Sequence, residues 1–168
     1  MSWLQQRPWV AQTRFDTPLG PVTLAATAQG LGGLWFEGQA HHPGPLSAPE
    51  QPGHRWLAQA RDELNAYWND GHGARFTVPL DTGGTAFQQA VWQALRTIPT
   101  GSTDRYGEIA ARLGRPAAAR AVGAAVGRNP ISIIVPCHRV LGQQGALTGY
   151  AGGLDRKRDL LRREAAIF

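Results

Sequence analysis

The chain has 168 residues, 42% of them hydrophobic, which is enough for one ordinary domain or two small ones with a buried core. No apolar run approaches the roughly 18–20 residues that span a bilayer, and the N-terminus lacks the basic and apolar regions of a secretory signal, so we expect a cytoplasmic protein. The single cysteine excludes an intramolecular disulfide and a zinc site built on several cysteines.

The net charge of +5 is distributed unevenly along the chain. Residues 1–82 hold five arginines against seven acidic residues, a net charge of −2. Residues 83–168 hold eleven arginines and one lysine against five acidic residues, a net charge of +7. Arginine suits phosphate because its planar guanidinium donates two parallel hydrogen bonds. The excess indicates either a solvated basic face or a polyanion that the second half binds.

The first half has the pattern of a sheet followed by a helix. Short β-favouring runs separated by proline and glycine predict an antiparallel meander with strands near 13–16, 22–26 and 34–36. A helix is expected from about His54, because apolar residues then recur at helical spacing as far as Trp68. Residues 75–78 are a candidate further strand, and residues 81–84 have the composition of a linker. We therefore expect two domains, 1–82 and 83–168.

The second half is predicted to be mostly helical. Thr85 is a good N-cap for a first helix. The further helices are expected at 106–113, 117–126 and about 155–165, with a turn at 114–116. Two short helices joined by a glycine-containing turn are typical of a helix-turn-helix, a pattern that helical hairpins without DNA share.

The second helix of this pair consists almost entirely of small residues around Arg120. A helix that reads bases in the major groove needs arginine, asparagine or glutamine at several positions. Small side chains instead let the backbone come close to another surface, which is either a neighbouring helix or a narrow minor groove.

The segment from Asn129 to Val140 carries the candidate chemistry. Its apolar run 131–135 is expected to be buried as a strand or extended segment that delivers Cys137 and His138 at its end. A lone cysteine is usually a small buried hydrophobe, but a neighbouring histidine, arginine and acid can give it thiolate character. Adjacent side chains of an extended chain point to opposite sides, so we expect a water to bridge the cysteine and the histidine.

The run Pro136-Cys137-His138-Arg139-Val140 resembles the active-site signature of the O6-alkylguanine-DNA alkyltransferases, also called methylated-DNA–protein-cysteine methyltransferases. Asn129-Pro130 upstream and Tyr150 with Gly152-Gly153-Leu154 downstream extend the resemblance, which covers roughly residues 85–164. The first half is only compatible with the variable N-terminal domain of that family.

The resemblance implies an α+β fold. It combines an N-terminal antiparallel sheet and helix, ribonuclease-H-like, with a mostly helical C-terminal domain that has a winged helix-turn-helix-like DNA-binding motif.

The resemblance also implies catalytic roles. Cys137 is expected to be the nucleophile and the permanent alkyl acceptor. His138 is expected to act as the general base through a water, polarised by Glu164 on the last helix. Asn129 is expected to be a hinge that ties the helix pair to the active-site segment. Tyr106 is expected to push the 3′ phosphate and to donate a proton or hydrogen bond to guanine N3.

Further residues are implied to contact DNA and the extruded base. Arg120 is expected to enter the duplex and fill the space of the flipped nucleotide, while Ala117, Ala118 and Gly123 lie against the minor groove. The expected pocket residues are Pro136, Val140, Tyr150 and Ala151. Some relatives have serine after the pocket tyrosine; here Ala151 leaves only its backbone N–H for guanine O6.

The function that the resemblance implies is DNA repair by stoichiometric, irreversible transfer of an alkyl group from O6-alkylguanine, and from O4-alkylthymine, to Cys137. An alkyl group on O6 is hidden in the base stack, so the base must first be flipped out. The expected partner is double-stranded DNA carrying alkylated bases, with no membrane, and the protein is expected to be a monomer whose cooperativity on DNA is left open. No cofactor is expected and no metal, because the N-terminal cysteines of zinc-binding relatives are missing and His41, His42, His54 and His72 lack ligand spacing.

Two alternative functions remain at this stage. One is an alkylated-DNA binder without repair activity, against which Cys137, His138 and Glu164 argue. The other is a multiple-turnover cysteine hydrolase, against which the lack of an easy leaving path from a thioether argues.

Overall fold

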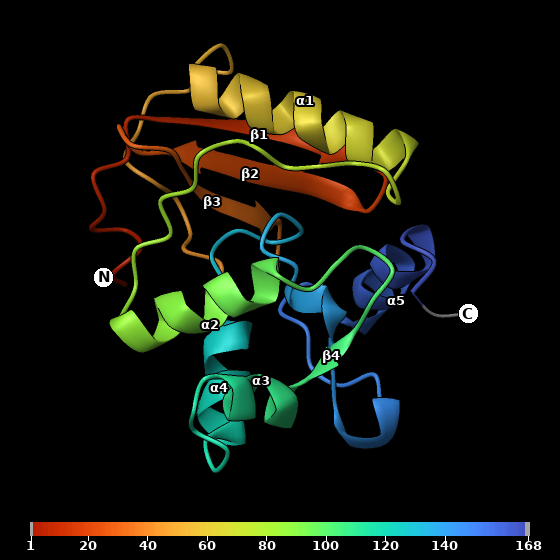
Figure 1. Ribbon diagram of the computed structural model, residues 1–168. Helices are drawn as coiled ribbons and strands as arrows, with labels where there is room; N and C mark the ends of the chain where they lie inside the picture. The colour runs from red at the N-terminus through yellow and green to blue at the C-terminus, as the bar shows by residue number, and fades with distance from the viewer. Residues whose placement is uncertain (1, 167–168) are drawn as a thin grey trace. The chain divides into compact units, whose positions relative to one another are not determined.

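The computed structural model describes residues 2–166. By the contacts among its residues the chain divides into two compact units, Met1–Thr82 and Gly83–Phe168 (Figure 1). Within the described residues, no helix is both long enough and apolar enough to cross a bilayer.

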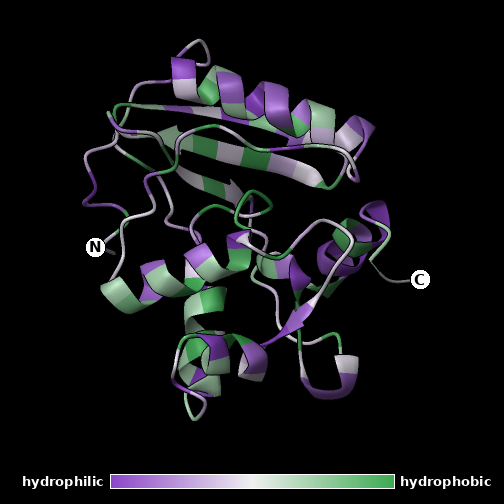
Figure 2. Ribbon diagram, viewed as in Figure 1, coloured by the Kyte–Doolittle hydropathy of each residue, from purple (hydrophilic) through white to green (hydrophobic). Residues whose placement is uncertain are grey.

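The first unit is an antiparallel sheet with one helix lying along it (Figure 1). Its elements are β1 (Ala11–Thr17), β2 (Gly20–Ala26), β3 (Leu31–Phe36) and α1 (Arg55–Asn69), and the strands pair in the order β1-β2-β3. The β1–β2 hairpin turns at Gly20, whose φ of 114° favours glycine. Hydrophobic and hydrophilic residues alternate around α1 (Figure 2), which buries Leu57, Leu64 and Tyr67. The predicted meander and helix are therefore present.

The strand predicted at 75–78 is wrong. The backbone N–H groups of Thr77 and Val78 donate to the Glu63 carboxylate on α1 at 3.0–3.1 Å, so they are not available for a strand ladder. Only an isolated bridge between Leu80 and Leu31 follows.

The second unit is mostly helical. Its helices are α2 (Ala86–Arg96), α3 (Tyr106–Arg112), α4 (Ala119–Gly127) and α5 (Leu154–Arg163), with 3₁₀ helices η1 (Cys137–Arg139) and η2 (Gln143–Gly145). Two short strands, β4 (Asp104–Arg105) and β5 (Val140–Leu141), pair in parallel. Thr85 begins α2 with a capping box shared with Gln88, as the sequence predicted for its N-cap. Trp92 of α2 donates to the carbonyl of Ala125 at 2.8 Å and so holds α4 against α2.

The helix bounds differ from the prediction by one or two residues, and the two largest differences are at the start of α4 and the end of α5. The helix expected from Ala117 begins at Ala119, because the preceding residues form a turn in which Ala118 N–H donates to Arg115 O. The last helix ends at Arg163, and Glu164 is its C-cap.

The apolar run 131–135 is buried as expected but is not a strand. It folds into consecutive turns, with Val135 N–H donating to Ile131 O at 3.0 Å and Ile134 N–H to Ser132 O at 2.8 Å. Ile133 has a φ of 73°, a left-handed conformation that a β-branched residue adopts only when its surroundings impose it.

Candidate active site

Asn129 links the end of α4 to the segment that carries Cys137. Its side-chain amide donates to Val135 O at 2.8 Å, and its side-chain oxygen accepts from Ile131 N–H at 2.9 Å. The residue is 4% exposed, so these bonds replace those that water would make. The position expected for the hinge therefore holds both ends of the turn segment 131–135.

Cys137 begins η1 directly after this segment. Its N–H donates to Val135 O at 2.8 Å, and Val140 N–H in turn donates to Cys137 O. Burial raises the pKa of its thiol to about 11, against the opposing effects of a hydrogen bond from Asn129 and the charge of Lys157. At neutral pH the thiol therefore keeps its proton until a base removes it.

His138 follows on the same 3₁₀ turn and is completely buried. Its Nε2 lies 2.7 Å from Oε2 of Glu164, while Arg139 Nε donates to Oε1 of the same carboxylate at 2.7 Å. Within the described part of the chain, Nδ1 of His138 has no hydrogen-bond partner. Cys137 and His138 lie on a 3₁₀ helix rather than on an extended chain. The expectation that an extended backbone points their side chains to opposite sides is therefore wrong.

The pKa values of this group follow from burial and pairing. Burial lowers the pKa of His138, although Glu164 counteracts it, so the imidazole is neutral at neutral pH. Burial would raise the pKa of Glu164, but His138 and Arg139 outweigh it and lower this pKa to about 2. A neutral imidazole that is hydrogen-bonded to an ionised carboxylate is suited to accept a proton, because the negative charge of Glu164 stabilises the resulting imidazolium.

Lys157 is a site residue that the sequence did not reveal. It is the only lysine of the chain and is completely buried. Its ammonium donates to the carbonyl oxygens of Val140 at 2.6 Å, Thr148 at 2.6 Å and Gly149 at 3.1 Å. It thus joins the two ends of the loop between β5 and Tyr150. Burial lowers its pKa to about 8, against the attraction of Cys137.

Arg139 was likewise not assigned to the site. Besides Glu164, it donates to Ile98 O at 2.7 Å and to Thr100 Oγ1 at 3.2 Å, which anchors the carboxylate from the end of α2. The sequence could have indicated this role of Arg139, because Arg139 directly follows His138 in the motif. No comparable signal marked Lys157, which stands in an arginine-rich helix and has the pattern of a solvated cation.

Tyr106 and Arg120 line a cavity of about 530 Å³ on the second unit. The cavity lies between the start of α3, α4 and the loop that carries η2; its lining residues are Arg105, Tyr106, Gly107, Glu108, Ala119, Arg120, Gly123 and Gln143. Gly123 leaves room beside the Tyr106 ring, since a Cβ there would lie 3.7 Å from Cδ1. Burial raises the pKa of Tyr106, as does the proximity of Cys137.

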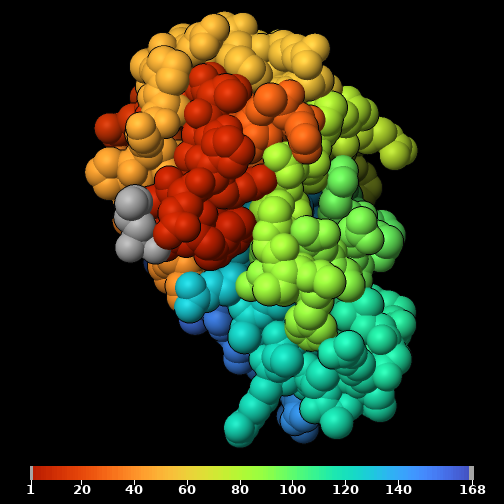
Figure 3. Space-filling view, turned by 90° about the vertical axis from the view of Figure 1, so that its left-hand side faces the viewer, coloured from red at the N-terminus to blue at the C-terminus, as the bar shows by residue number. Residues whose placement is uncertain are grey.

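The remaining predicted residues belong to two regions, the start of α4 and the segment around Cys137 and Tyr150. Ala117 is exposed and Ala118 half-buried at the start of α4, and α4 with the turn before it forms a continuous part of the visible surface (teal in Figure 3). Pro136 and Val140 are buried beside the thiol, and Ala151 is half-buried. Burial raises the pKa of Tyr150 well above its usual value, with a further contribution from Cys137.

Among the described residues no cluster of three or more histidine, cysteine or acidic side chains is arranged to hold a metal ion.

Both units match known families. Residues 86–166 match the DNA-binding domain of 6-O-methylguanine DNA methyltransferase, and residues 10–82 match its ribonuclease-like domain. The two matches define a protein in which a ribonuclease-like domain precedes a DNA-binding domain of this kind. The chain belongs to the 6-O-methylguanine DNA methyltransferase family, which confirms the resemblance and the fold class stated from the sequence.

Individual relatives agree with this assignment. The chain is 52% identical to a methylated-DNA–protein-cysteine methyltransferase of Mycobacterium bovis over 89% of its own length and 88% of the relative. It is 60% identical to a protein of the same name from Salmonella typhimurium over 64% and 63% of the two lengths. The crystal structure of Mycobacterium tuberculosis OGT in complex with DNA superposes with a TM-score of 0.85 at 50% identity and covers 94% of both chains.

Proposed function

We propose that this protein repairs alkylated DNA by transferring the alkyl group from O6 of guanine, and from O4 of thymine, to Sγ of Cys137. The observation that carries the proposal is the buried group of Cys137, His138 and Glu164 within the unit that matches a DNA-binding domain of this family. The acceptor is consumed, so each molecule reacts once.

Proton removal from the thiol is the first requirement, because burial keeps Cys137 protonated. His138 is neutral, and its Nδ1 is the ring nitrogen without a partner among residues 2–166, whereas Nε2 is bound to Glu164. The thiol proton passes to Nδ1, and a water between Sγ and Nδ1 provides the path. Glu164 holds the ring and stabilises its positive charge.

Alkyl transfer then follows with a balanced exchange of bonds. The bond between Sγ and the alkyl carbon forms as the bond between that carbon and O6 breaks, and the electron pair moves into the guanine ring. Tyr106 keeps its proton because its pKa is raised, and it supplies a proton or hydrogen bond at guanine N3. The products are a thioether on Cys137 and an unmodified guanine: the guanine anion takes up one proton, from Tyr106 or from water, and His138 releases the proton that it received from the thiol, so the exchange balances.

Access to O6 requires the base to leave the duplex, since the alkyl group is buried in the stack. Arg120 is exposed on α4 and enters the space that the base leaves, while the small residues Ala117, Ala118 and Gly123 let the backbone approach the minor groove. Tyr106, which lines the same cavity as Arg120, pushes the 3′ phosphate. A DNA-binding surface with few side chains that read bases lets the protein bind lesions in any sequence context.

We further propose that the protein acts as a monomer in the cytoplasm. The large hydrophobic side chains exposed among the described residues are Trp3, Val10 and Leu154, which are between 37% and 44% exposed. These few side chains offer little apolar surface for a stable dimer.

Intact mass spectrometry tests the proposal. Incubation with a duplex carrying O6-methylguanine should add one methyl group to the Cys137 peptide at a stoichiometry of one per protein. Cys137→Ser should remain unmodified while still binding the duplex. An unmodified wild-type protein would contradict the proposal, and continued turnover with excess substrate would favour a hydrolase instead.

A further inference from the structure

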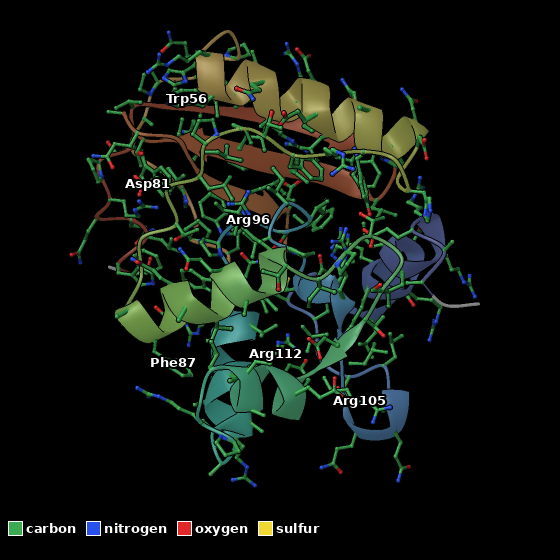
Figure 4. The ribbon with its side chains drawn as sticks, viewed as in Figure 1. Trp56, Asp81, Phe87, Arg96, Arg105 and Arg112 are labelled. Atoms are coloured by element: carbon green, nitrogen blue, oxygen red, sulfur yellow. The ribbon has the colours of Figure 1, made fainter. Side chains whose placement is uncertain are left out.

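The cavity beside Tyr106 has a second arginine whose role the proposed function does not use. Arg105 ends β4 directly before Tyr106, and it lines the cavity together with Arg120 of α4 and Gln143 of η2. Figure 4 shows Arg105 beside the loop coloured blue, which carries Gln143. The cavity lining therefore presents one cation from α4 and a second cation from the end of β4.

The backbone of Arg105 is fixed although its side chain is exposed. β4 pairs in parallel with β5, which places Arg105 opposite Leu141, and Arg105 N–H donates to Oδ1 of Asp104 at 2.8 Å. The same carboxylate forms an ion pair with Arg112 on α3. Burial would raise the pKa of Asp104, but hydrogen bonds with Arg112, with the Glu108 side chain and with the Arg105 N–H lower it, so the carboxylate is charged and already paired.

The guanidinium of Arg105 is thus left for another partner. Within residues 2–166 it makes no hydrogen bond or ion pair, and the same is true of the Arg120 guanidinium. Glu108, the acidic residue of the cavity lining, lies close enough for its charge to interact with Arg105, but its side chain is hydrogen-bonded to Asp104, which raises the pKa of Glu108. Arg105 is exposed, its backbone is held in place, and it stands next to Tyr106, which the proposed function places against the flipped nucleotide. When DNA occupies the cavity, the guanidinium of Arg105 therefore faces the phosphates of the strand.

We propose that Arg105 is a positioning residue that binds a phosphate of the damaged strand next to the flipped nucleotide and so holds that nucleotide in the cavity. The proposal rests on the proposed function. Its ligand is a backbone phosphodiester, which carries no sequence information, so Arg105 contributes to binding and to the rate of transfer from DNA without selecting a sequence. Glu108 opposes this contact by repelling the same phosphate.

The experiment compares a substrate with phosphates and one without. Single-turnover transfer to Cys137 is measured for a duplex carrying O6-benzylguanine and for the free base O6-benzylguanine. The variants are Arg105→Gln, Glu108→Gln, the double variant, and Arg96→Gln as the matched control, since Arg96 is an exposed arginine at the end of α2, outside the cavity lining. Binding to an undamaged duplex is measured in parallel as a function of salt concentration.

For Arg105→Gln we expect the rate with the duplex to fall about fivefold to tenfold more than the rate with the free base, as the loss of one charged hydrogen bond implies. The salt dependence of log K should become less steep by about 0.9, the value for one phosphate contact. Glu108→Gln should bind the duplex more tightly, and the double variant should keep the reduced salt slope. Arg96→Gln should behave as the wild type.

Three results would overturn the assignment. If Arg105→Gln slowed transfer equally with the duplex and with the free base, Arg105 would act by maintaining the fold of the site and not by binding a phosphate. An unchanged salt slope would exclude a phosphate contact. A double variant with wild-type binding would show that Arg105 only neutralises Glu108. Failure of the wild type to react with either substrate would instead contradict the proposed function, so the two failures are distinguishable.

Discussion

The two units of this protein bury different kinds of polar side chain. The buried polar residues described in the first unit are uncharged: Thr13, Thr27 and Gln39. In the second unit they include Asp104, His138, Arg139, Lys157 and Glu164. Charges removed from water cost free energy that only close partners offset. The first unit is thus built as a scaffold, whereas the second gives up stability to bury charged side chains, among them Arg139, Lys157 and Glu164 of the site that contains Cys137.

The largest expected effect comes from removing the central carboxylate of the second unit. Glu164→Gln leaves Arg139 buried without its counter-ion and takes the charged partner from His138, so the free energy of unfolding should fall by about 3–5 kcal/mol. Denaturant unfolding measures this. Glu63→Gln is the matched control in the first unit, where the carboxylate accepts from exposed groups. Equal losses for the two variants would remove the contrast between the units.

The loss in Glu164→Gln should also depend on pH. The pKa of Glu164 is lowered to about 2 from an ordinary 4.5, so its contribution is complete above pH 4.5 and is lost as the pH falls toward 2. The difference in stability between wild type and variant should therefore shrink over this window. A difference that is constant with pH would contradict the assigned ionisation.

A cavity in the first unit should change stability without changing the chemistry. Leu64 of α1 is completely buried, so Leu64→Ala should cost about 2–5 kcal/mol. The rate of transfer per folded molecule should remain that of the wild type, as measured by single-turnover kinetics well below the melting temperature. A slower transfer in this variant would show that the first unit takes part in the reaction.

The sequence predicted what local patterns encode. Helical spacing predicted α1, the capping residue Thr85 predicted the start of α2, and the cysteine motif led to the family. It failed where tertiary partners decide. Residues 75–78 look like a strand, but Glu63 takes their N–H groups. The run 131–135 looks extended, but the side chain of Asn129 folds it into turns. Lys157 looks solvated, but three carbonyl oxygens surround it.

Lys157 and Cys137 should have opposite effects on stability at alkaline pH. The pKa of Lys157 is lowered from 10.5 to about 8, so the unfolded chain binds more protons in this range and stability rises with pH. The pKa of Cys137 is raised from 9.0 to about 11, so stability falls with pH in that range. The two effects offset each other where the ranges overlap.

Alkylation of Cys137 separates the two contributions. Protein reacted with O6-benzylguanine has no thiol, so between pH 9 and 10.5, where the two ranges overlap, its stability should rise with pH more steeply than that of unreacted protein, by up to about 1.4 kcal/mol per pH unit. Lys157→Met should abolish the rise. Parallel profiles for reacted and unreacted protein, measured by denaturant unfolding, would show that folding does not raise the pKa of the Cys137 thiol.

The smallest expected effect concerns the start of the second unit. Thr85 accepts from Gln88 N–H at 3.1 Å and its own N–H donates to the Gln88 side chain at 3.0 Å. Thr85→Ala removes the side-chain cap and should cost about 1 kcal/mol. Thermal melting measures this loss, and Thr97→Ala at the other end of α2 serves as the comparison. No change in midpoint would mean that the cap contributes little to this helix.

The single lysine has a consequence for chemical labelling. Because its amine is completely buried and bonded to three carbonyl oxygens, reagents that acylate lysine should leave the side chains of the folded protein unmodified. The same reagents will modify Lys157 once the second unit opens. Mass-resolved acylation of this one amine therefore counts opening events of the active-site loop directly, without any introduced probe.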